Sequence, residues 1–222
     1  MIVLLTKKDA FSMQAIKLAK VFFGSDVTAI SGDLGDPFPE GMLWNMRPSI
    51  ISFLSPWIVP AKQLDGSALA INFHPASRNY PGIGCYNFAL YENAEEYGAT
   101  CHFMTEKVDT GAIIEERRFT VRPDETVESL KLRTMIVIIG LYHDVLSRLA
   151  ANELPQPSGL KWSRRPFTRK ELNALTETTP DMPANEIARR VRATTYPGYP
   201  GAKTVLGSVT SRADVAKRKP LA

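Results

Sequence analysis

Residues 68–84 read Ala-Leu-Ala-Ile-Asn-Phe-His-Pro-Ala-Ser-Arg-Asn-Tyr-Pro-Gly-Ile-Gly and decide how this chain folds. The apolar run 68–73 predicts a buried strand, and the Pro and Gly residues after it end the strand in a loop. Because side chains two apart on a strand point to the same side, Asn72 and His74 are expected to face one cavity. Open α/β sheets usually bind ligands at such strand ends. The stretch therefore predicts a strand with a site at its tip.

Further strands and helices surround this stretch. Short apolar runs predict strands, and apolar periodicity of 3.6 residues predicts helices. The strands are expected at residues 2–6, 27–30, 49–54, 98–105 and 112–121, and the helices at 12–23, 85–92, 126–151, 168–175 and 184–194. Strands and helices alternate over the first 75 residues, which favours a parallel sheet with helices on both faces. The later pair of strands resembles a hairpin and makes the sheet mixed. The predicted fold class is α/β with a mixed, mostly parallel sheet.

The composition changes after Asn152. Pro155, Pro157 and Gly159 form a linker. We expect three parts: a main domain at residues 1–151, a small C-terminal appendage of short helices at 152–207, and a basic, disordered tail at 208–222. For the tail, a solvated segment is favoured over a nucleic-acid contact.

Composition limits the class of protein. The chain has 222 residues and is 44% hydrophobic, enough for one core plus an appendage, and its net charge of +4 suits an anionic substrate. Cys85 and Cys101 are too few for a disulfide framework, so free thiols in a reducing compartment are expected. The first apolar run is too short for a signal peptide, and residues 135–142 fall far short of the ~20 residues of a bilayer crossing. We expect a cytoplasmic protein without membrane insertion.

Asn72, His74 and Asp109 together can support transfer of an acyl group to an amine. The amide of Asn72 can donate a hydrogen bond to a developing oxyanion, an interaction worth roughly 3 to 4 kcal/mol. His74 can move a proton near neutral pH or stabilise that oxyanion. Asp109, in a turn after a later strand, can orient His74, hold a water molecule or accept the proton of the amine. No serine or cysteine nucleophile is required.

Each of these residues also has a structural explanation. Asn and His often satisfy the backbone of a turn, and Asp-Thr-Gly is a common turn. His102, in a strand, and His143, on the long helix, are expected to be structural. A metal site formed by His74, His102 and Asp109 has suitable ligand types, but no HxxxH or CxxC spacing supports it. No metal is predicted.

The motifs, taken in their order, resemble the formyltransferase family that uses 10-formyltetrahydrofolate. This family includes glycinamide ribonucleotide, methionyl-tRNA and nucleotide-sugar N-formyltransferases. Its motifs are matched here by Asn72-Phe-His74-Pro75, Tyr80-Pro81-Gly82, Gly98-Ala-Thr100 and Asp109-Thr-Gly111-Ala-Ile113-Ile114. The resemblance is strongest over residues 49–121. It implies a Rossmann-like domain, a catalytic triad of Asn72, His74 and Asp109, and 10-formyltetrahydrofolate as cosubstrate.

The same resemblance implies a folate site. Residues 53–60 resemble the stretch whose backbone lines that site. The residues assigned to the site are Phe53, Leu54, Ser55, Pro56, Trp57, Ile58 and Val59, together with Gly111. The chain departs from the family in two places. Thr6-Lys-Lys-Asp lacks the glycine-rich first loop of the glycinamide ribonucleotide enzymes, which puts a purine-pathway substrate in doubt. His74-Pro-Ala-Ser-Arg78 stands where many relatives have Ser-Leu-Leu-Pro, so the loop is expected to differ.

The C-terminal part of the sequence indicates which class of acceptor molecule is favoured. Residues 180–202 resemble the linker that follows the catalytic domain in methionyl-tRNA and sugar formyltransferases, but few residues remain for the β-barrel of a tRNA enzyme. The favoured acceptor is the amine of a nucleotide-linked aminodeoxysugar for O-antigen or other surface polysaccharides, with GDP-perosamine and dTDP-linked 4-amino-4,6-dideoxyglucose as options. Arginine and aromatic side chains can hold phosphate and stack a base. The predicted substrate contacts are Arg78, Tyr80, Trp162, Arg164, Arg165 and Tyr196.

Several alternatives stay open. The aromatic residues of the appendage could instead attach it to the main domain by packing against that domain. Formyltetrahydrofolate hydrolysis would use the same triad, although that class normally carries an N-terminal regulatory domain for which the sequence leaves no room. A methionyl-tRNA formyltransferase-like enzyme and an inactive folate- or nucleotide-binding module are further options, and the complete triad argues against the inactive module. The helix is apolar nearly all round at residues 135–141 and needs cover, which favours a homodimer, although the core of the same chain could provide that cover.

Overall fold

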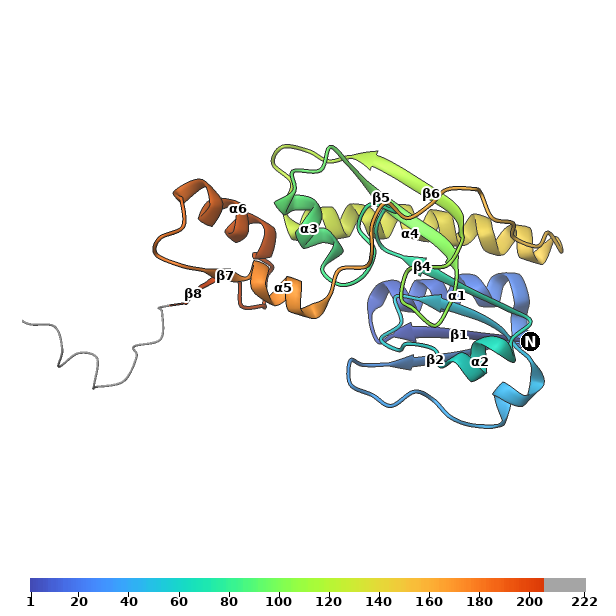
Figure 1. Ribbon diagram of the computed structural model, residues 1–222. Helices are drawn as coiled ribbons and strands as arrows, with labels where there is room; N and C mark the ends of the chain where they lie inside the picture. The colour runs from blue at the N-terminus through green and yellow to red at the C-terminus, as the bar shows by residue number, and fades with distance from the viewer. Residues whose placement is uncertain (206–222) are drawn as a thin grey trace, which may run out of the picture.

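The computed structural model describes residues 1–205 and has a six-stranded sheet at its centre (Figure 1). The strands lie in the order β2 (Val27–Gly32), β1 (Ile2–Lys7), β3 (Ser49–Phe53), β4 (Leu69–His74), β5 (Glu96–Phe103) and β6 (Ile113–Thr120). The strands β2, β1, β3 and β4 are parallel, whereas β5 pairs antiparallel with both β4 and β6. The predicted α/β class with a mixed, mostly parallel sheet is confirmed.

Alternating side chains divide the sheet into two faces. On one face, Ile51 and Phe73 belong to the main core, which is covered by α1 (Ala10–Phe23) and α4 (Val127–Ala150). On the other face, Val3 packs in a separate apolar cluster with side chains of the loops. Because neighbouring residues of β4 point to opposite faces, Phe73 in the core places the residues on either side of it on the face away from α4.

The long helix α4 forms where the sequence predicts it. The side chain of Thr126 accepts a hydrogen bond from the Ser129 backbone, and the Ser129 hydroxyl accepts one from the Thr126 backbone, so both ends of a capping box are present. Further along the helix, Tyr142 is fully buried and packs edge-on between Phe53 and Phe73 at 5.0 and 4.8 Å between ring centroids. The helix therefore covers β3 and β4 directly behind the predicted site.

The C-terminal part shares a core with the main domain. Its helices α5 (Arg169–Leu175) and α6 (Ala184–Thr194) lie beside α3 (Cys85–Tyr91) in Figure 1. Leu175 of α5 and Ala193 of α6 are buried in one cluster with side chains of α3 and of the first turns of α4. The appendage is thus attached through apolar packing.

The remaining elements are short. They are η1 (Gly24–Asp26), η2 (Met42–Met46), α2 (Ala61–Asp65), and the two-residue strands β7 (Glu177–Thr178) and β8 (Lys203–Thr204), which pair in parallel. Within residues 1–205, no helix combines the length and apolarity needed to cross a bilayer. The tail predicted at residues 208–222 lies outside the described residues.

Candidate active site

The antiparallel register of β4 and β5 places polar residues from both strands side by side. Asn72 of β4 lies directly opposite His102 of β5, and the Asn72 Nδ2 and His102 Nε2 atoms are 3.0 Å apart. His74 follows two residues later on the same side of β4. Polar side chains from two strands therefore meet on the sheet face opposite α4.

Asp109 lies at the centre of this group. Its Oδ2 atom is 3.2 Å from Nδ1 of His74 and accepts a 2.7 Å hydrogen bond from the Gly82 backbone, and its Oδ1 atom is 3.2 Å from Nε2 of His102. The side chains of Asp109 and both histidines are buried, with exposed fractions of 6% or less. The structure thus brings Asn72, His74 and Asp109 together and adds His102.

The charge of Asp109 is maintained by its partners. Burial alone would raise the pKa of this carboxyl. The charge of His74, the hydrogen bond and charge of His102, and the Gly82 N–H outweigh burial and lower the pKa of Asp109 to about 2. Asp109 is therefore a carboxylate at any pH at which the enzyme would work.

The hydrogen-bond partners define where protons lie on the two imidazoles. The Nε2 atom of His74 is 2.9 Å from the Tyr80 carbonyl, which can only accept, so His74 carries a proton on Nε2. A second proton on Nδ1 turns the contact with Asp109 into an ion pair. His102 likewise donates from Nδ1 to the Phe103 carbonyl. When His102 is neutral, its Nε2 accepts one amide hydrogen of Asn72, which leaves the other amide hydrogen for a ligand.

The turn that carries Asp109 has a special backbone. Asp109 has φ of 48°, a left-handed conformation that Asp and Asn tolerate better than most residues. Two residues later, a Cβ atom on Gly111 would lie 1.9 Å from the Phe103 carbonyl oxygen. Gly111 therefore lets the turn approach β5. Close packing of the turn is thus the structural function of Gly111, which the resemblance assigns to the folate site.

A cavity of about 450 Å³ opens onto the polar cluster, which consists of Asn72, His74, His102 and Asp109. It is in the size range of small-molecule sites. Asn72, His74 and Asp109 line it. So do six of the residues predicted to bind folate: Leu54, Ser55, Pro56, Trp57, Ile58 and Val59. Phe53 is not part of the cavity lining, and its ring is fully buried in the core against Tyr142, so the assignment of Phe53 to the folate site concerns its backbone only.

The predicted substrate contacts lie outside the lining of this cavity. Their side chains have partners within the chain. Arg164 forms an ion pair with Glu92, and Arg165 forms one with Glu171. The hydroxyl of Tyr196 accepts a hydrogen bond from Lys131.

The remaining three predicted contacts follow the same pattern. The guanidinium of Arg78 lies 3.8 Å from the Glu116 carboxylate, and the ring of Tyr80 packs against Tyr97 and Phe167. The indole of Trp162 packs against both imidazoles of the cluster. The contacts of Trp162 and Tyr196 agree with the alternative in which the aromatic residues of the appendage attach it to the main domain.

Sequence reasoning missed three residues of the site. His102, expected to be structural, is brought by the strand register into contact with Asp109 and Asn72. Its spacing of two residues from Thr100 in the Gly-x-Thr motif would have placed it on the same strand face. Lys107 and Arg169 line the cavity as exposed cations, and nothing local in the sequence indicates that position.

Other chemical groups do not form a comparable site. Burial raises the pKa of the Cys85 thiol to about 11, and it raises that of Cys101 further, so neither thiol is a ready nucleophile. Among residues 1–205, no group of three His, Cys, Asp or Glu residues is arranged to hold a metal ion. His143 is exposed and contacts Asp144 on the surface of α4.

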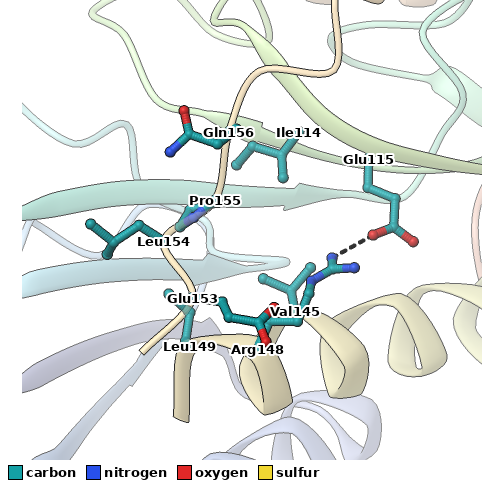
Figure 2. A pocket seen from close by; sticks show the side chains of 9 residues that line it. All are labelled: Ile114, Glu115, Val145, Arg148, Leu149, Glu153, Leu154, Pro155 and Gln156. Carbon is teal, nitrogen blue, oxygen red and sulfur yellow. Dashed lines mark hydrogen bonds and ion pairs between the residues drawn. The ribbon is translucent and has the colours of Figure 1, made fainter. Parts of the chain in front are cut away.

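A second hollow lies between β6 and the end of α4 (Figure 2). Its volume is about 240 Å³, and it is lined by Ile114, Glu115, Val145, Arg148, Leu149, Glu153, Leu154, Pro155 and Gln156. Arg148 pairs with Glu115 across it. Arg148 and Glu115 neutralise each other, and Glu153 is the one remaining charged residue of the lining, so the hollow offers no reactive cluster.

The lowered pKa of Asp109 predicts a loss of stability in acid. The pKa of this carboxyl falls from 3.8 to about 2 on folding, so its charged form stabilises the folded state above pH 3.8 by on the order of 2 kcal/mol. This contribution disappears as the pH falls through 2. Urea unfolding at about pH 5 and about pH 2.5 measures it. In Asp109→Asn the difference between the two pH values should be smaller, and equal differences in the two proteins would contradict this assignment.

Comparison with known proteins agrees with this site. The profile of the formyl transferase family matches residues 55–145, which include the whole polar cluster. A methionyl-tRNA formyltransferase from Chlorobium chlorochromatii is 28% identical over 169 residues, which cover 72% of this chain and 52% of that protein. The chain thus spans about half the length of this relative.

Solved structures show the same fold. A sugar N-formyltransferase from a Shewanella species has a TM-score of 0.73 at 18% identity over 93% of each chain. An N-formyltransferase from Helicobacter canadensis, solved with folinic acid and dTDP-3-aminofucose, has a TM-score of 0.69 at 18% identity and covers 87% of this chain and 80% of that one. Residues 55–145 therefore match the formyl transferase domain, and the described chain has the fold of the sugar N-formyltransferases.

Proposed function

We propose that the protein transfers the formyl group of 10-formyltetrahydrofolate to the amine of a nucleotide-linked aminodeoxysugar. The observation that carries this proposal is the cluster of Asn72, His74 and Asp109 at the wall of the cavity. The adjoining strip at residues 54–59 gives the same cavity an apolar wall able to hold a pterin ring. Cosubstrate and reactive groups would thus share one cavity.

In the proposed reaction, the neutral amine attacks the formyl carbon. The carbonyl oxygen becomes an oxyanion that accepts a hydrogen bond from the free amide hydrogen of Asn72, and the positive charge of a protonated His74 stabilises it. Asp109 remains a carboxylate, holds both imidazoles and assists removal of the proton from the amine. The bond between the formyl carbon and N10 then breaks, and N10 takes up a proton. Each step uses a group already in place in the cluster.

The charges around the cavity support an anionic acceptor. Asp109 is the one carboxylate among the described residues that line it, and it is buried, whereas Lys107 and Arg169 are exposed at the wall. Two cations from separate segments suit the diphosphate of a nucleotide sugar. The neighbour solved with dTDP-3-aminofucose gives the same class of ligand. A role in O-antigen or other surface polysaccharide synthesis, and a homodimer, are parts of the same proposal.

The experiment that tests the function incubates the purified protein with 10-formyltetrahydrofolate and several nucleotide-linked aminosugars, which should include 3-amino and 4-amino sugars on dTDP and GDP. Mass spectrometry should show one aminosugar gaining a formyl group, with tetrahydrofolate released in equal amount. Formate without a formylated product would instead identify a hydrolase. Formylation of methionyl-tRNA would identify the tRNA reaction, and no reaction in any arm would support a binding module.

Removing a cation from the cavity wall should weaken acceptor binding. Arg169→Ala and Lys107→Ala are each expected to raise KM for the nucleotide sugar about tenfold, because a hydrogen bond to a charged group contributes about 1.5 to 3 kcal/mol. Steady-state kinetics with the acceptor varied measure the effect. Arg165→Ala is the matched control, since Arg165 is an exposed arginine near Arg169 that does not line the cavity. If the control raises KM as much as Arg169→Ala, the cavity site for the diphosphate is wrong.

A further inference from the structure

Trp162 lies against the two histidines of the site. Its ring centroid is 5.9 Å from that of His74 and 5.1 Å from that of His102, with edge-on angles of 72° and 84°. Its Nε1–H group donates a 2.8 Å hydrogen bond to the carbonyl of Gly111, two residues after Asp109. Trp162 is not among the residues lining the cavity, so its indole contacts the imidazoles from outside the space that a substrate would occupy.

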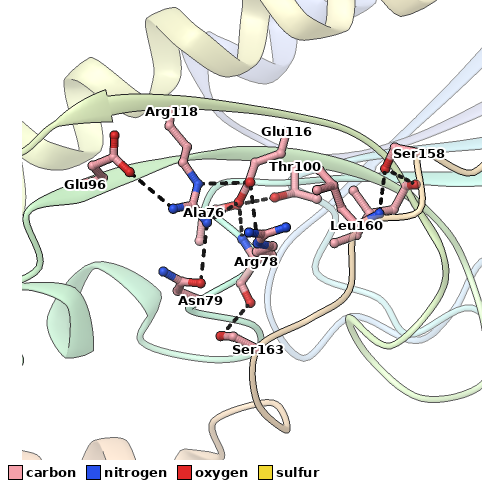
Figure 3. A network of polar contacts seen from close by, with 11 residues as sticks. Ala76, Arg78, Asn79, Glu96, Thr100, Glu116, Arg118, Ser158, Leu160 and Ser163 are labelled. Atoms are coloured by element: carbon pink, nitrogen blue, oxygen red, sulfur yellow. Dashed lines mark hydrogen bonds and ion pairs between the residues drawn. The ribbon is translucent and has the colours of Figure 1, made fainter.

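Residues 158–168, which we call the C-terminal strap, fix the position of this indole. At one end, the backbone and hydroxyl of Ser158 both donate to the Ile113 carbonyl at the start of β6 (Figure 3). In the middle, the backbone N–H of Ser163 donates to the Arg78 carbonyl at 3.2 Å. At the other end, Phe167 donates to Pro81 and accepts from Ile83 at 2.9 and 3.0 Å.

The strap joins the two segments that supply the catalytic groups. The loop at residues 75–84 follows His74 and provides the Tyr80 carbonyl and the Gly82 N–H, and the turn at residues 105–112 provides Asp109. The loop is also fixed from the opposite side by Glu116, a buried carboxylate that accepts hydrogen bonds from the Arg78 backbone and from Arg118 (Figure 3). The strap is therefore placed to control how the two segments meet.

The chemistry of the cluster makes this placement important. Each imidazole must present a particular nitrogen to Asp109, and both contacts are 3.2 Å long, so a small rotation of either ring would break them. Edge-on aromatic packing restricts such rotations, and an indole covering the rings excludes water from that side. Misplacement of catalytic groups by about 1 Å can lower a rate about 100-fold.

We propose that Trp162 is a positioning residue for formyl transfer: its indole holds the imidazoles of His74 and His102 in the orientation that their contacts with Asp109 require. This inference rests on the proposed function and replaces the substrate contact that the sequence suggested for Trp162. A residue acting in this way changes kcat and leaves KM for both substrates nearly constant, because it touches neither of them.

Two variants and one matched control test the inference. Trp162→Ala is expected to lower kcat about 10- to 100-fold with both KM values within about twofold. Trp162→Phe retains an aromatic ring and should recover most of kcat. Trp44→Phe is the control, because Trp44 also donates from Nε1 to a backbone carbonyl, that of Pro39, far from the cluster along the chain and outside the cavity lining. It should leave kcat unchanged.

Nitrogen NMR of the imidazoles supplies a readout that needs no activity. The chain has three histidines, so ¹⁵N-histidine labelling gives a spectrum of three rings. In Trp162→Ala the signals of His74 and His102 should shift, and in Trp162→Phe they should shift less. The exposed His143 serves as the internal reference. If Trp162→Ala does not fold, the Trp162→Phe spectrum and kcat are the deciding data.

The outcomes separate this inference from the proposed function. A raised KM for the acceptor with unchanged kcat would make Trp162 a substrate contact and overturn the inference. Unchanged signals of His74 and His102 together with unchanged kcat would make it a packing residue only. If the wild-type protein transfers no formyl group to any acceptor, the proposed function fails, and the NMR comparison still shows whether Trp162 orients the two rings.

Discussion

Replacing Asp109 by asparagine is expected to lower kcat for formyl transfer about 1,000-fold while the protein stays folded. The carboxylate contacts Nδ1 of His74 and Nε2 of His102 and accepts a hydrogen bond from the Gly82 N–H, whereas an amide offers a single acceptor oxygen. At least one contact must then face an N–H group, and the charge that balances a protonated imidazole is lost. The left-handed backbone at residue 109 suits Asn as well as Asp, so the turn should be preserved.

The measurement is the single-turnover rate of formyl transfer with both substrates saturating, together with circular dichroism of the purified variant. Asp144→Asn is the matched control, because Asp144 also contacts Nδ1 of a histidine, His143, but does so on the surface. That control should retain the wild-type rate. A rate for Asp109→Asn within tenfold of the wild type would remove Asp109 from the mechanism.

His74→Ala is expected to have a comparable effect, lowering kcat by about 1,000-fold, because it removes the imidazole whose positive charge stabilises the oxyanion and which transfers protons. KM for the nucleotide sugar should change little if His74 acts mainly in the transition state. Added imidazole should restore part of the activity, since the substitution leaves a space of similar shape beside Asp109. His143→Ala is the control and should be fully active, because His143 is exposed on α4.

A different result for His74→Ala would locate the chemistry elsewhere. If kcat stays near the wild-type value and circular dichroism shows a folded protein, the cluster does not carry formyl transfer. A large loss in His102→Ala with none in His74→Ala would move the proton-transfer function to the second imidazole. Both results can be obtained with the same assay.

The strands and helices could be predicted because their signals are local. Apolar runs, apolar periodicity and the cap at Thr126 act within a few residues, and they place β4, β5 and α4 close to their observed bounds. The two-residue spacing of Asn72 and His74 likewise predicts their common direction. The functions of Phe53 and His102 were not predictable in this way, because each depends on which strand lies beside it and on which face α4 packs.

The C-terminal part also shows the difference between what the local sequence predicts and what tertiary packing decides. Its arginine and aromatic residues have the composition of a nucleotide site, yet Arg164 and Arg165 pair with acidic side chains, while Trp162 packs against the histidines. Composition records which interactions a residue can make. Which partner it meets depends on where the chain returns after α4, and that follows from burial of Leu175 and Ala193 against α3 and α4.

The amino-acid sequence alone therefore establishes the order of the elements, the strand tip with Asn72 and His74, and the motif that places Asp109 in a turn, since short-range geometry encodes all of these. The meeting of Asp109 with both imidazoles, the addition of His102, Lys107 and Arg169 to the site, and the position of Trp162 follow from the fold. They depend on a strand register that pairs Asn72 with a residue 30 positions away, and on packing between segments still further apart. Contacts at such separations are set by burial of the whole core, which no local pattern encodes.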